Sequence, residues 1–287
     1  MKLLILESSL RLGNEIILLM NAIVYGLQNN FDKIIVPEYE FLNSTEILIN
    51  DNIHDKENII YEKISTGSLF YATIYDRDSL QTLVFHLPHR YVYEKYLEKY
   101  INIDTNTDTI DMTLFTRSED VFQQKQATQK QPSLYFYKKS MQLEAKEKCL
   151  LISHDLLNPV SNYLYNNQHV DWKPQEWRTD ITAILNSESL AFGLSSLIYF
   201  VVLASKKLKR LYYPKIAWDD VVKFHTDIFN FKIEDILNTD QELILIDHPD
   251  YPYYQNNEHT PEAYDQMINY FPKEENIIRI KGKYTCN

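Results

Sequence analysis

Apolar strands and helices alternate without a break between residues 148 and 213, and this pattern constrains the fold more than any other feature of the chain. Strands are predicted at 148–153, near 168–171, at 188–192 and at 209–213. Helices are predicted from about residue 158, over 176–186 and over 195–206. Helices between buried strands indicate a parallel sheet in an α/β fold, whose ligands bind beyond the carboxyl ends of the strands.

The N-terminal part of the chain begins with the same alternation. A strand at 2–7, a short turn with Gly13, a helix at about 14–27 and a strand at 33–36 form a β-α-β unit. Up to residue 100 the pattern is weaker, and it predicts strands near 58–61 and 69–75 and a helix over 78–100. The polar segment 102–108 then predicts a boundary between an N-terminal domain, 1–105, and a C-terminal domain, 106–287.

Three further elements are predicted between that boundary and the regular alternation. A strand over 110–116 is followed by the Gln-rich sequence QQKQATQKQPS at 123–133, which we expect to be a loop rather than part of the core. A helix over 133–145 follows it. Because the strands are expected to be parallel, the polar residues that follow their carboxyl ends are expected to lie at one edge of the predicted sheet.

The amino-acid composition argues against nucleic acids and membranes as main partners of the protein. The chain has 29 Lys and Arg residues against 40 Asp and Glu residues, a net charge of −11. We therefore expect no nucleic-acid partner and at most a peripheral membrane association. The longest apolar run, 190–204, is too short to span a bilayer, and too few apolar residues precede Glu7 for a signal peptide. Cys149 and Cys286 form no disulfide framework, which predicts a cytoplasmic protein.

The turn after the strand at 188–192 is a candidate anion site. Only five glycines occur in 287 residues, and one of them, Gly193, stands at this turn shortly before Ser195 and Ser196. Free backbone N–H groups and two hydroxyls at a helix N-terminus attract an anion. The alternative is structural: Gly193 permits a positive φ and the serines cap a buried helix.

A serine hydrolase is a further alternative for the same turn. Gly193-Leu194-Ser195 begins the Gly-x-Ser-x-Gly pattern of a nucleophile elbow, in which Ser195 would be the nucleophile. Leu197 stands in place of the second glycine. Asp247 and His248 are adjacent in sequence, which makes separate roles in a catalytic triad awkward.

Other candidate residues also follow predicted strands. The Arg117 guanidinium can hold a diphosphate, although Glu119 and Asp120 allow a surface ion pair instead. Ser153-His154-Asp155 offers a titratable histidine or a carboxylate for a ribose. Asn14 and Glu15 begin the first helix, where the helix dipole favours an acid and a cleft-facing carboxylate would be a general base. His86 and His89 have no third ligand at a suitable spacing, so no metal site is predicted.

Three blocks of sequence resemble motifs of the fucosyltransferase superfamily, in particular its bacterial α-1,2-fucosyltransferase-like members. RLGNEIILLMNAIVYG looks like the opening Gly-x-Gly-Asn-Gln helix of that family, and LFTRSEDVF looks like its His-x-Arg-x-Gly-Asp motif. TDITAILNSESLAFGLSSLIYFVVLAS looks like its Asp-led donor motif, which ends in Ser-Ser. LLISHDLLNPVSNYLYN resembles the intervening strand and helix. The four blocks together cover about a quarter of the chain.

The resemblance implies a GT-B-like fold, that is, two Rossmann-type domains whose parallel sheets face a central cleft, with a C-terminal helix that can pack back on the N-terminal domain. It implies an inverting, metal-independent glycosyltransferase with no cofactor, which moves a sugar such as L-fucose to a glycan or lipid-linked oligosaccharide. By this resemblance, Arg117 would hold the β-phosphate of the donor, Ser195 and Ser196 would hold phosphate oxygens, and Asp180 would face the base or the ribose. Gly13, Asn14, Ser153, Asp155 and Gly193 complete the donor site of a GDP-sugar.

The sequence also departs from the family motifs. Phe115 replaces the histidine that helps to read guanine, Glu119 replaces the motif glycine, and Glu15 replaces the motif glutamine. Leu194 stands where a small or polar residue is usual. These departures leave the donor base open, and they define a second hypothesis, a catalytically silent glycan-binding or scaffold protein of the same fold.

Overall fold

The computed structural model describes residues 1–7, 12–50, 59–65, 89–105, 107–118, 131–193, 195–215, 236–251 and 260–285. Contacts between Cα atoms divide the chain into two compact units. Unit 1 comprises Met1–Ile103, Ser196–Ala204 and Val222–Ile236, and unit 2 comprises Asp104–Ser195, Ser205–Val221 and Leu237–Asn287. The first segment ends near the expected boundary at 105. The other two segments of unit 1 fall inside the range that the sequence assigned to the C-terminal domain.

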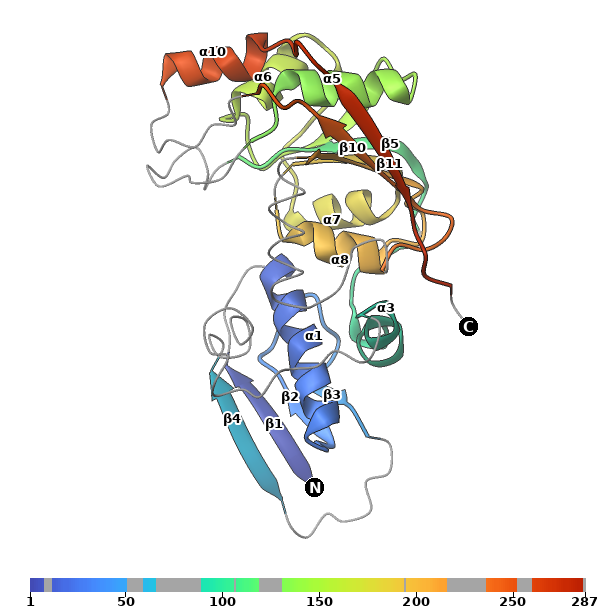
Figure 1. Ribbon diagram of the computed structural model, residues 1–287. Helices are drawn as coiled ribbons and strands as arrows, with labels where there is room; N and C mark the ends of the chain where they lie inside the picture. The colour runs from blue at the N-terminus through green and yellow to red at the C-terminus, as the bar shows by residue number, and fades with distance from the viewer. Residues whose placement is uncertain are drawn as a thin grey trace. The chain divides into compact units, whose positions relative to one another are not determined.

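Unit 1 contains a four-stranded sheet with the order β3-β2-β1-β4 (Figure 1). The strands are β1 (Lys2–Glu7), β2 (Lys33–Ile35), β3 (Glu46–Leu48) and β4 (Ile60–Ser65). β1 runs parallel to β2 and β4, whereas β3 is antiparallel to β2. The first two strand predictions are confirmed, the strand expected near 58–61 lies at 60–65, and the one expected at 69–75 falls outside the described residues.

The helices of unit 1 are α1 (Leu12–Gln28), α3 (His89–Val92) and α8 (Leu197–Ala204), with a π-helical turn at Tyr93–Leu97 and a 3₁₀ turn at Glu98–Tyr100. The helix expected over 78–100 is thus helical in its described part, 89–100, although three helix types follow one another there. α8 packs against α1. Seven of the eight residues of α8 are buried, as expected for a helix that is apolar on all sides.

A buried arginine binds the C-terminal end of α8. The Arg90 guanidinium is 3% exposed and donates hydrogen bonds to the carbonyl oxygens of Val202 (2.5 Å) and Leu203 (3.3 Å). Its Nε donates to the carbonyl oxygen of Ile236 at 2.5 Å. The last carbonyls of a helix lack intrahelical donors and carry partial negative charge, so a cation there stabilises the helix.

Gly13 allows α1 to approach α8 closely. It lies in the first turn of α1 rather than in the turn before it. A Cβ placed at Gly13 would lie 2.5 Å from the backbone nitrogen of Leu197 and 2.7 Å from the carbonyl carbon of Ser196. No glycine in the described part of the chain has a positive φ. The alternative that Gly193 is needed for a positive φ is therefore wrong, and close packing explains both glycines.

Unit 2 contains a seven-stranded sheet with the order β11-β10-β9-β8-β5-β6-β7. All neighbouring strands are parallel except β10 and β11. Counted along the chain from β5, the six parallel strands have the spatial order 3-2-1-4-5-6 of doubly wound folds, which reverses between β5 and β8. The strands are β5 (Ile110–Phe115), β6 (Cys149–Ile152), β7 (Val170–Asp171), β8 (Ser187–Phe192), β9 (Arg210–Pro214), β10 (Glu242–Asp247) and β11 (Asn276–Lys281).

Helices cover both faces of this sheet. Figure 1 shows α5, α6 and α10 on one face and α7 on the other. The helices are α5 (Leu134–Leu143), α6 (Pro159–Asn166), α7 (Trp177–Leu185) and α10 (Pro261–Asn269). The helices and strands expected between 110 and 213 are confirmed. α10 packs against α5 and α6 within unit 2, whereas the expectation allowed a C-terminal helix to pack on the N-terminal domain.

The chain is an α/β protein with two sheets of predominantly parallel strands. Each sheet also has one antiparallel strand at its edge, β3 in unit 1 and β11 in unit 2, which the expectation of parallel sheets did not include. β2 and β3 are joined by ten residues without a described helix, so no helical crossover returns β3 in the parallel direction. None of the described helices is long and apolar enough to cross a membrane.

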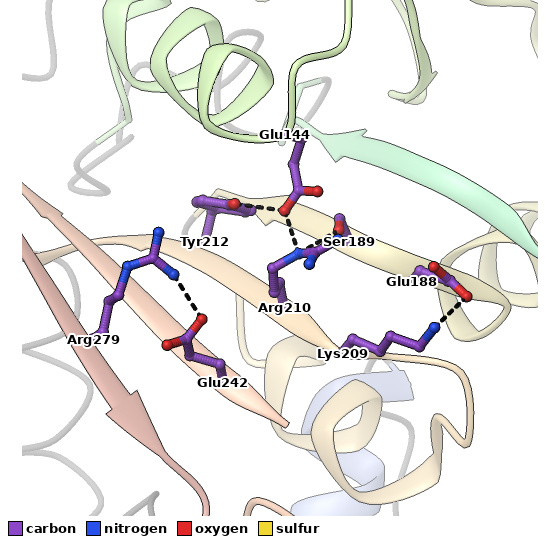
Figure 2. Close-up of polar contacts among 8 residues, drawn as sticks. All are labelled: Glu144, Glu188, Ser189, Lys209, Arg210, Tyr212, Glu242 and Arg279. Carbon is purple, nitrogen blue, oxygen red and sulfur yellow. Dashed lines mark hydrogen bonds and ion pairs between the residues drawn. The ribbon is translucent and has the colours of Figure 1, made fainter. Parts of the chain in front are cut away.

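A polar network ties the C-terminal end of α5 to the amino ends of β8 and β9 (Figure 2). The Glu144 carboxylate, whose side chain is 6% exposed, lies 2.5 Å from Arg210 Nε and accepts a hydrogen bond from the Tyr212 hydroxyl at 2.5 Å. Arg210 also donates to Ser189 Oγ at 3.2 Å. Nearby, exposed Lys209 and Arg279 pair with acids on β8 and β10. The amino edge of the sheet is thus held by structural contacts, and the candidate residues of unit 2 lie at the opposite edge.

Candidate functional site

The candidate site in unit 2 lies at the carboxyl ends of β5, β6 and β8, where the strand order reverses. Hydrogen bonds continue past the last strand residues: the Thr116 N–H donates to Ile152 O (3.0 Å) and the Gly193 N–H donates to Phe115 O (3.1 Å). The rings of Phe115 and Phe192 stack with centroids 4.3 Å apart and planes 12° apart. In doubly wound sheets this switch point is the usual place for a ligand.

Arg117 projects from a backbone that is fixed on both sides. Its carbonyl oxygen accepts a hydrogen bond from Asn158 Nδ2 at 2.9 Å, and the Asn158 N–H donates to Ser118 Oγ at 3.1 Å. Asn158 is the N-cap of α6 and also accepts a bond from the Val160 N–H. The half-buried Arg117 side chain therefore starts from an ordered turn. Glu119 and Asp120, its expected ion-pair partners, lie outside the described residues.

Ser153 and Asp155 organise the turn after β6. The Ser153 hydroxyl, which is buried, donates to the carbonyl oxygen of Asp155 at 2.7 Å. Asp155 Oδ1 accepts hydrogen bonds from the Ser118 hydroxyl and from the Leu157 N–H. The structure thus brings Ser153 and Asp155 together with the Arg117–Ser118 turn, and it uses both side chains to hold the loops.

Asp180 lies in the first turn of α7, in a partly buried position. Burial raises the pKa of its carboxyl from an ordinary 3.8 to about 6, although a hydrogen bond from Gln175 and the charge of the exposed His154 act in the opposite direction. The electrostatic interaction between Asp180 and His154 indicates that the first turn of α7 lies near the turn after β6. A carboxyl with this pKa changes charge close to neutral pH, as expected for a group in a functional site.

We expect the Asp180→Asn variant to be more stable than the wild type at pH 7 and equally stable near pH 4. The raised pKa means that the folded state holds the proton more tightly, so wild-type stability falls as the pH rises from about 4 through about 6. Urea unfolding of both proteins from pH 4 to pH 7 measures the difference. Asp250→Asn is the control, and its effect on stability should have the opposite sign: a hydrogen bond from Tyr270 lowers the pKa of Asp250, so the substitution should destabilise the protein at pH 7. If the difference in the free energy of unfolding between Asp180→Asn and the wild type does not grow as the pH rises, the expectation is contradicted.

Gly193 and Ser195 lie at the carboxyl end of β8 in unit 2. A Cβ placed at Gly193 would lie 3.0 Å from the hydroxyl of Tyr137, and that hydroxyl donates to Phe115 O at 3.0 Å. Gly193 thus makes room for Tyr137 of α5. Ser195 is half-buried, Leu194 lies outside the described residues, and Ser196, also half-buried, belongs to unit 1.

Three other predicted residues lie in the first turn of α1, in unit 1: Gly13, Asn14 and Glu15. Asn14 is half-buried, whereas the Glu15 side chain is 1% exposed. The Tyr39 hydroxyl donates to Glu15 Oε2 at 2.8 Å, and the Tyr39 ring stacks on Phe41 with centroids 5.0 Å apart. The first turn of α1 therefore holds an oriented carboxylate.

Ser118, Asn158 and Tyr137 hold the site together, and the sequence did not predict these three roles. The Asn158-Pro159 pair is a helix N-cap followed by proline at the first helical position, so it carried a usable signal. Tyr137 carried none, because its hydrogen bond joins α5 to the end of β5, 22 residues away. Residues 131–133 have no regular secondary structure, as expected for the Gln-rich loop, but the side chains of Gln131 and Ser133 are each only 1% exposed. The rest of that expected loop, 123–130, lies outside the described residues.

The described residues include no group of three or more His, Cys, Asp and Glu side chains that is arranged to hold a metal ion. His89 is buried, and its Nδ1 contacts the hydroxyl of Tyr199, while His86 lies outside the described residues. His248 is 3% exposed, and neither of its ring nitrogens forms a hydrogen bond with a described residue. A catalytic triad with Ser195 requires both nitrogens of His248, so this geometry gives the hydrolase alternative no support.

Comparisons with known proteins place the chain in no family. No family model matches it, and no curated protein or solved structure matches it at a significant level.

Proposed function

We propose that the protein is an inverting, metal-independent glycosyltransferase that moves a sugar from a nucleoside diphosphate donor to a glycan or a lipid-linked oligosaccharide. The fold we propose is GT-B-like, with the donor bound by unit 2. One observation carries the proposal: Arg117 lies on an ordered turn at the switch point of a sheet with the doubly wound strand order. The donor we favour is a GDP-sugar such as GDP-L-fucose, as the resemblance of the sequence motifs implies.

The chemistry of transfer fits these residues. When the bond between the sugar and the diphosphate breaks, negative charge develops on the departing diphosphate and the sugar becomes oxocarbenium-like. The Arg117 guanidinium stays charged at any working pH and offers a planar fork of donors to phosphate oxygens. Fixed donors that face the developing charge lower the barrier without reorganisation, and they do so with no metal ion in the step.

A panel of nucleotide sugars tests the proposal. The protein is incubated with GDP-, UDP- and CMP-sugars, and both hydrolysis of the donor and the shift of the melting temperature are measured. We expect one class of donor to be hydrolysed slowly without an acceptor and to raise the melting temperature. No turnover and no shift with any donor would refute the proposal.

Glu15 is the general base in this proposal, because it is an oriented carboxylate in the domain that we assign to the acceptor. We expect Glu15→Gln to lower kcat by about a hundredfold or more, the usual contribution of a general base. Tyr39→Phe is the control, since it removes the hydrogen bond to Glu15 Oε2 but keeps the carboxylate. An unchanged kcat in Glu15→Gln would leave Glu15 as a helix-start acid.

A catalytically silent glycan-binding protein of the same fold is the second candidate. The stacking of Phe115 on Phe192 favours it, because the side chain at the position of the guanine-reading histidine packs within the protein. Glycan binding without nucleotide binding, measured by titration calorimetry, would decide for this candidate.

A further inference from the structure

Buried polar side chains without hydrogen bonds gather around the N-terminal end of α5. Gln131 and Ser133 are each 1% exposed, and within the described part of the chain neither the amide nitrogen and oxygen of Gln131 nor the hydroxyl of Ser133 has a hydrogen-bond partner. His248, whose two ring nitrogens are also unpartnered, packs edge-on against Tyr135 with ring centroids 5.2 Å apart. Buried polar groups in native proteins are nearly always satisfied, so such a cluster indicates a missing partner.

Ser133 is the N-cap of α5, yet its hydroxyl accepts no hydrogen bond from the helix. An N-cap serine ordinarily accepts a bond from an N–H of the first turn, and Thr260 of α10 does so with the N–H of Ala263 at 3.2 Å. The first N–H groups of a helix lack the acceptor that an α-helix provides further along. At α5 the Phe136 N–H donates to the Ser133 carbonyl oxygen at 3.1 Å, so the N–H groups of Leu134 and Tyr135 are the ones that can bind an anion, and the Ser133 hydroxyl lies at the same helix end as a further donor.

The first turn of α5 lies at the carboxyl edge of the sheet. Tyr137 donates to Phe115 O at the end of β5 and touches the Cβ position of Gly193 after β8. Tyr135 contacts His248, which follows β10. The helix is ten residues long, so its N-terminus carries a full dipole contribution. The helix end and the two unpartnered side chains thus occupy the edge at which ligands of doubly wound sheets bind.

We propose that the N-terminal end of α5, with Gln131 and Ser133, binds a phosphate group of the donor diphosphate. The Ser133 hydroxyl, the Gln131 amide N–H groups and the backbone N–H groups of the first turn donate to the phosphate oxygens. The assignment rests on the proposed function for the identity of the ligand as a nucleoside diphosphate. It adds a second phosphate-binding element to Arg117.

Pyrophosphate is the probe, because it tests the phosphate site independently of the base. Its affinity for the full chain is measured by titration calorimetry for the wild type, Gln131→Met and Ser133→Ala, and GDP, UDP and CDP are titrated in parallel. We expect each variant to bind pyrophosphate about ten- to a hundredfold more weakly, as for the loss of a hydrogen bond to a charged group. Affinity equal to that of the wild type in both variants would overturn the inference and leave the proposed function standing.

Thermal melting without ligand separates a binding role from a structural one. Replacing an unpartnered buried polar group by an apolar group of similar size costs little, so both variants should melt at or above the wild-type temperature. Thr260→Ala removes the N-cap hydrogen bond of α10, so this variant should melt at a lower temperature than the wild type. If both variants melt lower and bind pyrophosphate normally, ordered water rather than phosphate occupies the site. If the wild type binds neither pyrophosphate nor any nucleoside diphosphate, the proposed function fails as well.

Discussion

We expect the Arg117→Ala variant to lose the proposed transfer activity by about three orders of magnitude and to keep the stability of the wild type. Removing one fixed donor from a charge-stabilising site typically costs 10²–10³ in kcat, and a guanidinium that binds two phosphate oxygens at once contributes more than a single donor. The fold should be unaffected, because the hydrogen bond that fixes the turn uses the carbonyl oxygen of Arg117, which alanine retains. Steady-state kinetics with the donor identified in the panel, and urea unfolding, measure both quantities.

Two further variants sharpen this test. Arg117→Lys keeps the positive charge but loses the planar fork, so we expect intermediate activity. Arg279→Ala removes an exposed arginine that pairs with Glu242 at the amino edge of the sheet, and it should leave kcat unchanged. Full activity in Arg117→Ala would remove Arg117 from the mechanism and favour the silent glycan-binding protein.

The Gly13→Ala variant is destabilised by about 2 kcal/mol or more, because the new methyl group must push two backbones apart. The added Cβ would lie 2.5 Å from the Leu197 nitrogen and 2.8 Å from its Cα, and backbone atoms cannot rotate away as a flexible side chain does. The gain in helix propensity on replacing glycine by alanine, about 1 kcal/mol, is smaller than this cost. Urea unfolding of the variant and the wild type measures the difference.

Gly26→Ala in the same helix is the matched control. There the added Cβ meets the Cδ1 atom of Ile49, the far end of a side chain that can change rotamer. We expect its free energy of unfolding to lie within about 1 kcal/mol of the wild-type value, since the propensity gain offsets the adjustment. Equal effects of the two substitutions would contradict the assignment of Gly13 to close helix packing. A loss of donor affinity in Gly13→Ala without a loss of stability would return Gly13 to the donor site.

The elements between 110 and 214 were predictable because their signals are local. β5, β6 and β8 are short apolar runs that begin and end at polar residues, and Asn158-Pro159 marks the start of α6. The carboxyl-edge position of Arg117, Asp155 and Gly193 followed from that alternation. The order of the strands in the sheet did not, because it depends on the crossovers rather than on any strand's own sequence.

The assignment of α8 to unit 1 was not predictable for a similar reason. α8 follows β8 directly, so its sequence position placed it in the second domain, but its apolar surface packs against α1. The burial of Gln131 was missed because five of the eleven residues of QQKQATQKQPS are glutamine, a composition typical of exposed loops. Composition describes a segment as a whole, whereas burial is decided residue by residue by the packing around it.

Hydrogen exchange of the full chain with and without a saturating nucleoside diphosphate tests the central claim, that unit 2 binds the donor at its switch point. We predict slower exchange at the backbone N–H groups of the turns after β5, β6 and β8 and of the first turn of α5. The amino edge of the sheet around Glu144 and Arg210 should exchange as in the free protein. Unchanged exchange at those turns while the nucleotide is bound would contradict the claim.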